Sequence, residues 1–130
     1  MSSSIQAAVA TDDITPKVGC RLATYQRTER SKGILDRLEL STLVLRSAAA
    51  TFVWITVDNV VFLVGETNPL RLAVAKLCET PLSHVMVSFS HTHSGPEVDA
   101  DCLKLITDAR PEGGVPEAES IASVRVIFDQ

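Results

Sequence analysis

Aromatic residues and cysteines are scarce in this sequence of 130 residues. Phe, Trp and Tyr together make up 5% of the chain. The three cysteines, Cys20, Cys78 and Cys102, are widely separated and form no Cys-x-x-Cys pair. An odd number at this spacing argues against a disulfide framework and against a structural zinc site. We therefore expect reduced thiols that pack as small hydrophobic groups.

A strong charge of one sign and long hydrophobic runs are also missing. The 12 Lys and Arg residues against 16 Asp and Glu give a net charge of -4, with no basic block of the kind that binds nucleic acid. The longest apolar stretches, residues 48–57 and 60–64, are too short to span a bilayer. Residues 1–10 lack the positive segment of a secretory signal. We expect a cytoplasmic protein with no transmembrane segment and no nucleic-acid partner.

Three common catalytic or nucleotide-binding motifs do not occur in the sequence. These are the phosphate loop Gly-x-x-x-x-Gly-Lys, the dinucleotide fingerprint Gly-x-Gly-x-x-Gly and the nucleophile elbow Gly-x-Ser-x-Gly. Nucleotide binding and a standard serine hydrolase mechanism therefore have no support. The length and the 45% hydrophobic content suit one small domain over residues 1–130.

The pattern of apolar runs and turn residues predicts strands, loops and helices in alternation. Strands are expected at residues 5–9, 38–45, 51–57, 85–89 and 123–128, turns at 11–16 and 46–50, a long loop at 17–33, and a short helix at 100–109. Asn68 followed by Pro69 signals a helix start, which predicts a helix over residues 68–79. The strand, helix and strand between residues 51 and 89 indicate a right-handed crossover between parallel strands. The expected fold class is α/β, with a mixed sheet.

The His-x-His pair at the end of the last of these strands is the first candidate for chemistry. On an extended strand, His91 and His93 project to the same side and can share a metal ion. They also lie at the carboxyl end of a predicted parallel strand, where open α/β sheets bind ligands. Two hydrogen-bonded histidines without a metal are the alternative. The isolated His84 is expected to be structural or solvent-facing.

Acidic residues near this strand end are candidates for further ligands. Asp58 follows a neighbouring predicted strand, whereas Glu97 and Asp99 follow the turn after the histidines. We interpret Glu97 and Asp99 as residues that cap strands and solvate loops. Asp58 remains a candidate ligand, and a zinc site of His91, His93 and Asp58 with water in the fourth position is one hypothesis.

Residues 85–96, whose last six read His-Thr-His-Ser-Gly-Pro, resemble the strand and motif of the neutral and alkaline non-lysosomal ceramidases. Residues 13–19 are similar to the family's Asp-Ile-Thr-Pro segment, residues 23–25 to its Ala-Gly-Tyr, and residues 33–38 to its Gly-Val-His-Asp-Pro-Leu. The chain departs from these patterns where Thr24 replaces glycine and where Leu35 and Arg37 replace histidine and proline. The resemblance covers most of residues 5–97.

This resemblance implies a zinc-dependent hydrolase that cleaves the amide of ceramide into a sphingoid base and a fatty acid. It assigns zinc binding to His91, places His93 in the active site beside the substrate as a catalytic residue, and places Thr24 and Tyr25 in the substrate-binding segment. The family's other zinc ligands, a histidine, a glutamate and a tyrosine, and its Gly-Asp-Val-Ser-Pro nucleophile segment would lie beyond Gln130. We therefore expect a truncated piece of a larger catalytic domain, with low or no activity alone.

Two functional hypotheses follow from these observations. In the first, a lipid-like amide is the substrate, and a complementing chain or a second copy of this one supplies the missing ligands. In the second, the chain is a non-catalytic α/β module for binding or oligomer assembly that retains unused histidines.

Overall fold

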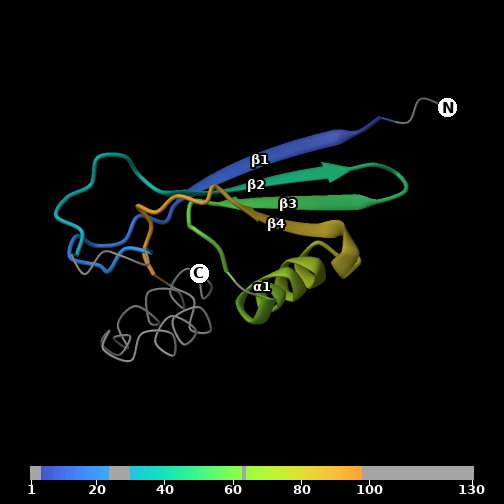
Figure 1. Cartoon of the computed structure of the whole chain (residues 1–130). Helices are drawn as coiled ribbons and strands as arrows, with labels where there is room; N and C mark the ends of the chain where they lie inside the picture. The colour runs from blue at the N-terminus through green and yellow to red at the C-terminus, as the bar shows by residue number, and fades with distance from the viewer. Residues whose placement is uncertain (1–3, 24–29, 63, 98–130) are drawn as a thin grey trace.

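The computed structural model describes residues 4–23, 30–62 and 64–97 of the chain. Its elements are β1 (Gln6–Asp13), β2 (Glu39–Arg46), β3 (Thr51–Val57), α1 (Val64–Leu77), the 3-10 turn η1 (Leu82–His84) and β4 (Val85–Phe89). The strands form one sheet in the order β1-β2-β3-β4, and α1 lies against one face of it (Figure 1). β1, β2 and β3 pair antiparallel, whereas β3 and β4 pair parallel. The predicted α/β class with a mixed sheet and a parallel crossover is confirmed.

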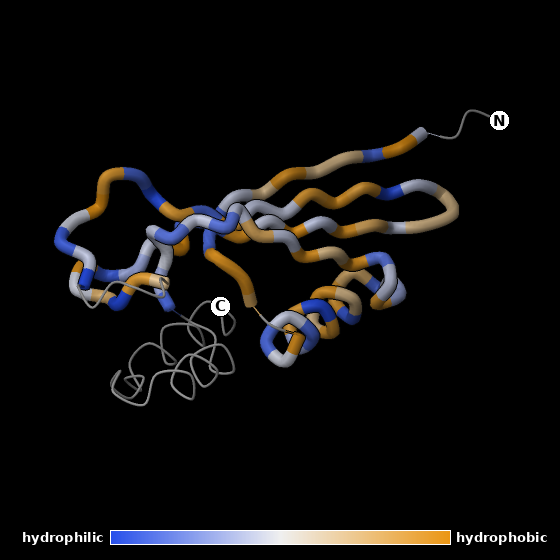
Figure 2. The backbone as a smooth tube through the Cα atoms, in the orientation of Figure 1, coloured by the Kyte–Doolittle hydropathy of each residue, from blue (hydrophilic) through white to orange (hydrophobic). Residues whose placement is uncertain are grey.

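The core lies between α1 and the side of the sheet that faces it. Alternate residues of β3 point to this side, and its three members Val53, Ile55 and Val57 are buried with Val85 of β4. Ala75 of α1 and Phe62 complete the buried cluster. The later part of the connection from β3 to α1 is hydrophobic (Figure 2), and its residues Val60 and Phe62 are buried. Apolar residues with a period of two thus fix which face of β3 meets the helix.

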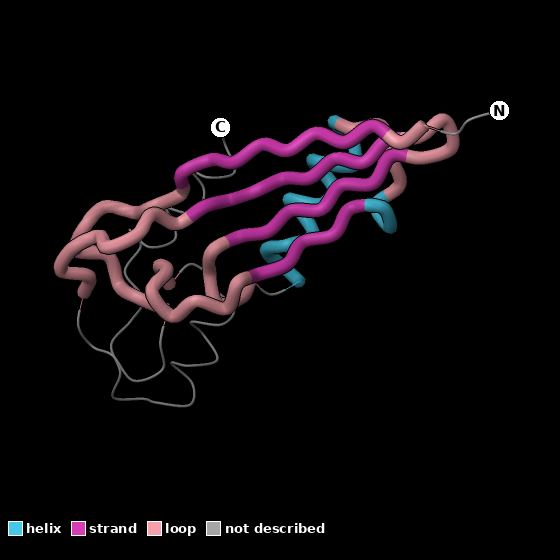
Figure 3. Tube along the Cα trace, turned by 90° about the horizontal axis from the view of Figure 1, so that it is seen from above, coloured by secondary structure: helices cyan, strands magenta, loops and turns pink. Residues whose placement is uncertain are grey.

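The opposite face of the sheet is apolar and open. Its exposed members include Phe52 and Trp54 of β3, Leu45 of β2, Met86 of β4 and Val9 of β1. The view from above shows the four strands in front of α1, with no described helix or strand crossing this face (Figure 3). Trp54, which is 45% exposed, donates its indole N–H to Ser88 Oγ at 2.9 Å. Within the described residues, the sheet is therefore covered by α1 on one face only.

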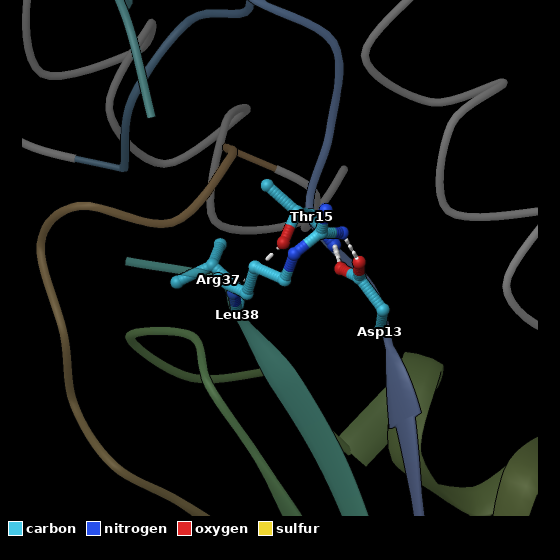
Figure 4. Close-up of polar contacts among 4 residues, drawn as sticks. All are labelled: Asp13, Thr15, Arg37 and Leu38. Atoms are coloured by element: carbon cyan, nitrogen blue, oxygen red, sulfur yellow. Dashed lines mark hydrogen bonds and ion pairs between the residues drawn. The ribbon is translucent and has the colours of Figure 1, made fainter. Parts of the chain in front are cut away.

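The link between β1 and β2 differs from the prediction at its start. β1 continues to Asp13, so the predicted strand at 5–9 is too short and the predicted turn at 11–16 begins too early. Pairing with Ser41, Leu40 and Glu39 of β2 extends the strand through the polar residues 11–13. Beyond it, the Asp13 carboxylate accepts hydrogen bonds from the Thr15 backbone N–H and the Arg37 guanidinium, while Thr15 Oγ1 accepts from the Leu38 N–H (Figure 4).

The remaining boundaries are correct to within a residue, except for the helix. β2 and β4 match the predicted 38–45 and 85–89, and β3 matches 51–57. α1 begins at Val64 and not at residue 68, so Asn68 is not its N-cap and Pro69 lies inside the helix. The Asn68 side chain instead accepts a hydrogen bond from Arg71 at 3.2 Å. The predicted elements at 100–109 and 123–128 lie outside the described residues.

Candidate functional site

The candidate site lies where β3 and β4 end side by side. Val57 and Phe89 are paired in the parallel register, so the chain leaves both strands at the same level of the sheet. Three segments, residues 21–23, 58–60 and 91–97, meet beyond this edge, and we call them the loop cluster. In Figure 1 it lies at the end of the sheet opposite the β2–β3 turn. This is the carboxyl edge that the position of the histidines predicts.

The two histidines lie next to each other in the loop cluster. The ring centroids of His91 and His93 are 5.3 Å apart, with the ring planes at 85°. The two residues have left strand geometry, because the backbone of His91 has a φ of 61°, in the left-handed region. Such a conformation costs about 1–3 kcal/mol in a residue other than glycine and recurs at functional sites. The predicted pairing of the histidines is present, but a turn produces it instead of an extended strand.

Each imidazole is oriented by a backbone carbonyl from a distant segment. His91 Nδ1 lies 3.1 Å from the Val60 carbonyl oxygen, and His93 Nδ1 lies 2.9 Å from the Ala23 carbonyl oxygen. A carbonyl can only accept, so the proton in each neutral ring is assigned to Nδ1. The Nε2 lone pairs of both rings are then available to a metal ion or a proton. Metal-binding histidines typically show this arrangement, in which the second nitrogen donates to a carbonyl.

The histidine pair fits a zinc ion in spacing but not in ligand number. Two imidazoles on a tetrahedral zinc, with each nitrogen about 2.0–2.1 Å from the ion, have ring centres about 5 Å apart. The observed separation of 5.3 Å is comparable. However, the described part of the chain contains no group of three or more His, Cys, Asp and Glu side chains that could hold a metal. Within the described residues, no third side chain of these types joins the pair to make a metal-binding set.

Asp58 does not complete the set in this conformation. Its Oδ2 accepts a hydrogen bond from the Glu39 backbone N–H at 3.0 Å, and its own N–H donates to the Glu39 carbonyl at 2.9 Å. These contacts join the end of β3 to the start of β2. In the described structure, Asp58 thus closes the sheet edge.

Backbone pairing holds the first and third segments of the loop cluster together. Leu22 and Pro96 form an antiparallel bridge. On either side of it, the Ala23 N–H donates to the Gly95 carbonyl at 2.9 Å, and the Glu97 N–H donates to the Arg21 carbonyl at 3.0 Å. The same short ladder therefore fixes the residue whose carbonyl orients His93.

Asn59 connects the second segment of the loop cluster to the third and is 3% exposed. Its Nδ2 donates to the Pro96 carbonyl at 3.1 Å, and its Oδ1 accepts from the Val60 N–H at 2.6 Å. Gly95 allows this close approach, because a Cβ there would lie 3.3 Å from the Asp58 carbonyl oxygen, a tight contact. By accepting the hydrogen bond from its N–H, Asn59 holds Val60, whose carbonyl orients His91. The sequence gives no signal for this role beyond an Asn directly after a strand.

Glu97 is buried, and its interpretation as a residue that solvates the loop is wrong. The residue is 6% exposed, and its Oε2 lies 2.9 Å from Arg21 Nε. This distance makes an ion pair, although the alignment is poor and Oε2 accepts no hydrogen bond. Burial raises the pKa of the Glu97 carboxyl above its usual range, and the attraction of Arg21 opposes the rise. The pairing of residues 21–23 with 95–97 brings Glu97 beside Arg21.

The other predicted site residues have different outcomes. Thr24, Tyr25, Asp99 and Cys102 lie outside the described residues. His84 is structural, as predicted: its Nδ1 lies 3.1 Å from the Thr51 carbonyl oxygen and its ring stacks on Phe52. Among the described residues, Cys20 and Cys78 are unpaired, and Cys78 packs against the hydrophobic core. Within the described residues, no helix has the length and apolar character needed to cross a membrane.

Comparison with solved structures identifies the fold. The chain is similar to the neutral ceramidase from Pseudomonas aeruginosa, with a TM-score of 0.55 and 22% identity over 75% of this chain and 16% of that one. It is likewise similar to a ceramidase complexed with C2, with a TM-score of 0.54 and 21% identity over 74% of this chain and 16% of that one. No protein-family model and no curated protein matches the sequence. The ceramidase resemblance of the sequence is thus confirmed for the fold, over a small part of the solved structures.

Proposed function

We propose that this chain is the amino-terminal part of a ceramidase-like hydrolase domain, in which His91 and His93 contribute half of a zinc site. The observation that carries the proposal is the pair of imidazoles whose Nδ1 atoms are both engaged by backbone carbonyls. This arrangement leaves both Nε2 lone pairs for a ligand, as in metal-binding histidines. The pair lies at the carboxyl edge of the parallel strands, in a fold similar to that of neutral ceramidase. The proposed substrates are N-acyl lipids of the ceramide type.

The histidines of this chain hold the ion and face the substrate in the proposed site. A bound zinc supplies Lewis-acid chemistry and lowers the pKa of a coordinated water toward neutrality. In the proposed arrangement, His91 is a zinc ligand and His93 lies beside the substrate as a second ligand or a catalytic group. Asp58 becomes a ligand only if it leaves the Glu39 N–H. Thr24 and Tyr25 are proposed to contact the lipid.

Activity of the chain alone is expected to be low or absent. A catalytic zinc site generally needs three protein ligands, and two donors hold the ion weakly. The chain spans 16% of the length of the neutral ceramidase to which it is similar. We propose that the missing ligands come from a longer polypeptide or from a complementing chain.

Zinc binding is the direct test of the half site. We expect zinc to raise the melting temperature of the wild-type chain, because a ligand that binds only the folded state stabilises it. His91→Ala and His93→Ala should each reduce this shift. The matched control is His84→Ala, which removes a structural histidine on the opposite end of β4 and should keep the shift even if it lowers the starting stability. No shift in the wild type at millimolar zinc would refute the proposed site.

A separate assay tests the incompleteness of the site. The purified chain with excess zinc should hydrolyse a fluorescent ceramide analogue no faster than a zinc-only blank. Hydrolysis above the blank that His91→Ala abolishes would show that the chain contains a complete site, and would overturn this part of the proposal.

The open sheet face favours assembly with another polypeptide as a second candidate function. Phe52, Trp54 and Met86 expose apolar surface on one continuous face. Exposed apolar patches of this kind mark interaction sites. Light scattering coupled to size exclusion would reveal a second copy on this face, and Trp54→Lys should then return the chain to a monomer. A monomeric wild type would leave a longer or complementing chain as the occupant.

A further inference from the structure

Two charged residues, Arg21 and Glu97, flank the ladder that carries the carbonyl partner of His93. The Glu97 N–H donates to the Arg21 carbonyl, and the side chains of the same two residues form an ion pair, with Arg21 Nε 2.9 Å from Glu97 Oε2. Two residues further along, the Ala23 N–H donates to the Gly95 carbonyl, and the Ala23 carbonyl faces His93 Nδ1. The ion pair and the His93 contact thus lie at the two ends of one three-residue ladder.

Residues 21–23 contact two other segments in the described structure. On one side, Arg21 forms an antiparallel bridge with Arg30, next to the contacts of Gly19 and Cys20 with Ser31. On the other side, the ladder to residues 95–97 and the contact of the Ala23 carbonyl with His93 Nδ1 join it to the histidine turn. A side-chain pair that closes one end of so short a ladder restricts the sliding and twisting of the other end. The Arg21–Glu97 pair lies at the end of the ladder opposite the Ala23 carbonyl.

We propose that the Arg21–Glu97 pair is a positioning latch, which holds the Ala23 carbonyl against His93 Nδ1 and thereby directs His93 Nε2 toward its ligand. Neither residue touches the proposed metal or substrate. The inference rests on the proposed function for its consequence in metal binding. The orientation of His93 itself is a property of the metal-free chain and can be measured without zinc.

The burial of Glu97 is consistent with a positioning role rather than with a stabilising one. Removing a carboxylate from water is costly, and a single arginine contact with poor alignment offsets only part of that cost. Buried pairs of this kind add little stability, but in some proteins they fix one arrangement among several. Glu97→Gln removes the buried charge together with the pair, so it is expected to release the arrangement at a smaller loss of stability than Arg21→Gln, which leaves Glu97 buried without its partner.

The test is the tautomer of each histidine in the metal-free chain, read from long-range proton–nitrogen spectra above the pH at which histidines titrate. With three histidines in the chain, the signals can be assigned by single substitutions. Wild-type His91 and His93 should both carry the proton on Nδ1. In Arg21→Gln and in Glu97→Gln, His93 should lose this preference while His91, which is held by Val60, keeps it. Arg21→Lys, which retains the charge, should restore part of it.

The matched control is Arg37→Gln, which breaks the ion pair with Asp13 at the start of β2 and should leave both histidines unchanged (Figure 4). An unchanged His93 tautomer in folded Arg21→Gln and Glu97→Gln would overturn the latch. Equal changes at His91 and His93 would overturn it as well, because they would indicate a general loosening of the loop cluster. If one Gln variant fails to fold, the other decides by the same two criteria.

A zinc titration separates this inference from the proposed function. Where the wild-type chain binds zinc, Glu97→Gln should weaken binding about 10-fold or more, as for other residues that orient metal ligands. Where the wild type binds no zinc, the proposed function fails, and the tautomer measurement still decides the latch. Unchanged affinity in Glu97→Gln would overturn the role of the latch in metal binding.

Discussion

The body of the protein, β1–β4 with α1, is held together differently from the loop cluster at its end. Between the sheet and α1, the contacts are those of buried aliphatic side chains such as Val53, Ile55 and Val85. In the loop cluster, the contacts are hydrogen bonds between backbone groups, one buried amide at Asn59 and one ion pair. Apolar packing tolerates conservative exchange, whereas a network of single polar contacts depends on each partner. The difference separates the residues that maintain the fold from those that orient the histidines.

Within the body, the two faces of β3 differ in how far their side chains are buried. Ile55 faces α1 and is 3% exposed, whereas its neighbour Trp54 lies on the open face and is 45% exposed. The covered face accounts for most of the stability that burial provides. The open face contributes apolar surface that the described structure does not bury.

The largest predicted effect is a cavity in the body. Ile55→Ala should lower the free energy of unfolding by about 2–5 kcal/mol, because it removes buried methyl groups and leaves a cavity. Met86→Ala on the open face is the control and should cost about 1 kcal/mol or less. Urea unfolding of the full chain measures both. A loss in Met86→Ala as large as that in Ile55→Ala would show that the open face is covered in solution.

The second effect is the loss of the buried amide in the loop cluster. Asn59→Ala leaves the Pro96 carbonyl and the Val60 N–H without their partner and should cost about 2 kcal/mol. Asn68→Ala on α1 removes one half-buried contact to Arg71 and should change stability by about 0.5 kcal/mol at most. The same unfolding measurement applies. Similar losses in the two variants would contradict the assignment of Asn59 as the connection between the segments.

A smaller effect is expected from a methyl group at the crossing of two loop segments. Gly95→Ala places a Cβ about 3.3 Å from the Asp58 carbonyl oxygen and should destabilise the chain by about 1 kcal/mol. Gly33→Ala is the matched control, because a Cβ there meets nothing within 4 Å. Gly33→Ala reduces the conformational entropy of the unfolded chain, so it should stabilise the folded state by about 0.4–1 kcal/mol. Melting temperatures that shift in opposite directions would confirm the prediction, and a stabilised Gly95→Ala would contradict it.

The smallest effect is a pH dependence from Glu97. Burial raises the pKa of its carboxyl in the folded state above the ordinary 4.5, so the folded state binds the proton more tightly than the unfolded state. The stability linked to this proton is fully present below pH 4.5 and is lost as the pH rises through the raised pKa. Relative to Glu97→Gln, the wild-type chain should therefore become less stable over this range. Urea midpoints at several pH values measure the difference, and a relative gain by the wild type would show that Arg21 outweighs burial.

Local pattern was sufficient for much of the body. β3 and β4 were predicted at their observed bounds, because alternating apolar residues indicate both the strand and the face of it that is buried. The start of α1 was missed, since Asn68 and Pro69 carry a helix-start signal that the tertiary structure overrides. β1 was predicted too short because its residues 11–13 are polar and are strand only through pairing with β2.

The loop cluster was predictable only in part. The turn after the strand and the closeness of His91 and His93 follow from a short motif, and the resemblance of that motif indicated the fold. The burial of Glu97 and the role of Asn59 were not predictable, because each depends on a segment far away in the sequence. Glu97 meets Arg21, and Asn59 meets Pro96, 37 residues further along the chain.

The sequence by itself determined a small α/β protein with two neighbouring histidines at the end of a strand. Periodicity and a six-residue motif act over short distances and can be seen in a single chain. The tertiary structure alone decided how these histidines are oriented. Their partners are the carbonyls of Val60 and Ala23, which lie 31 and 70 residues away. Every residue has such a carbonyl, so only the folded arrangement of the segments selects which two of them orient the rings.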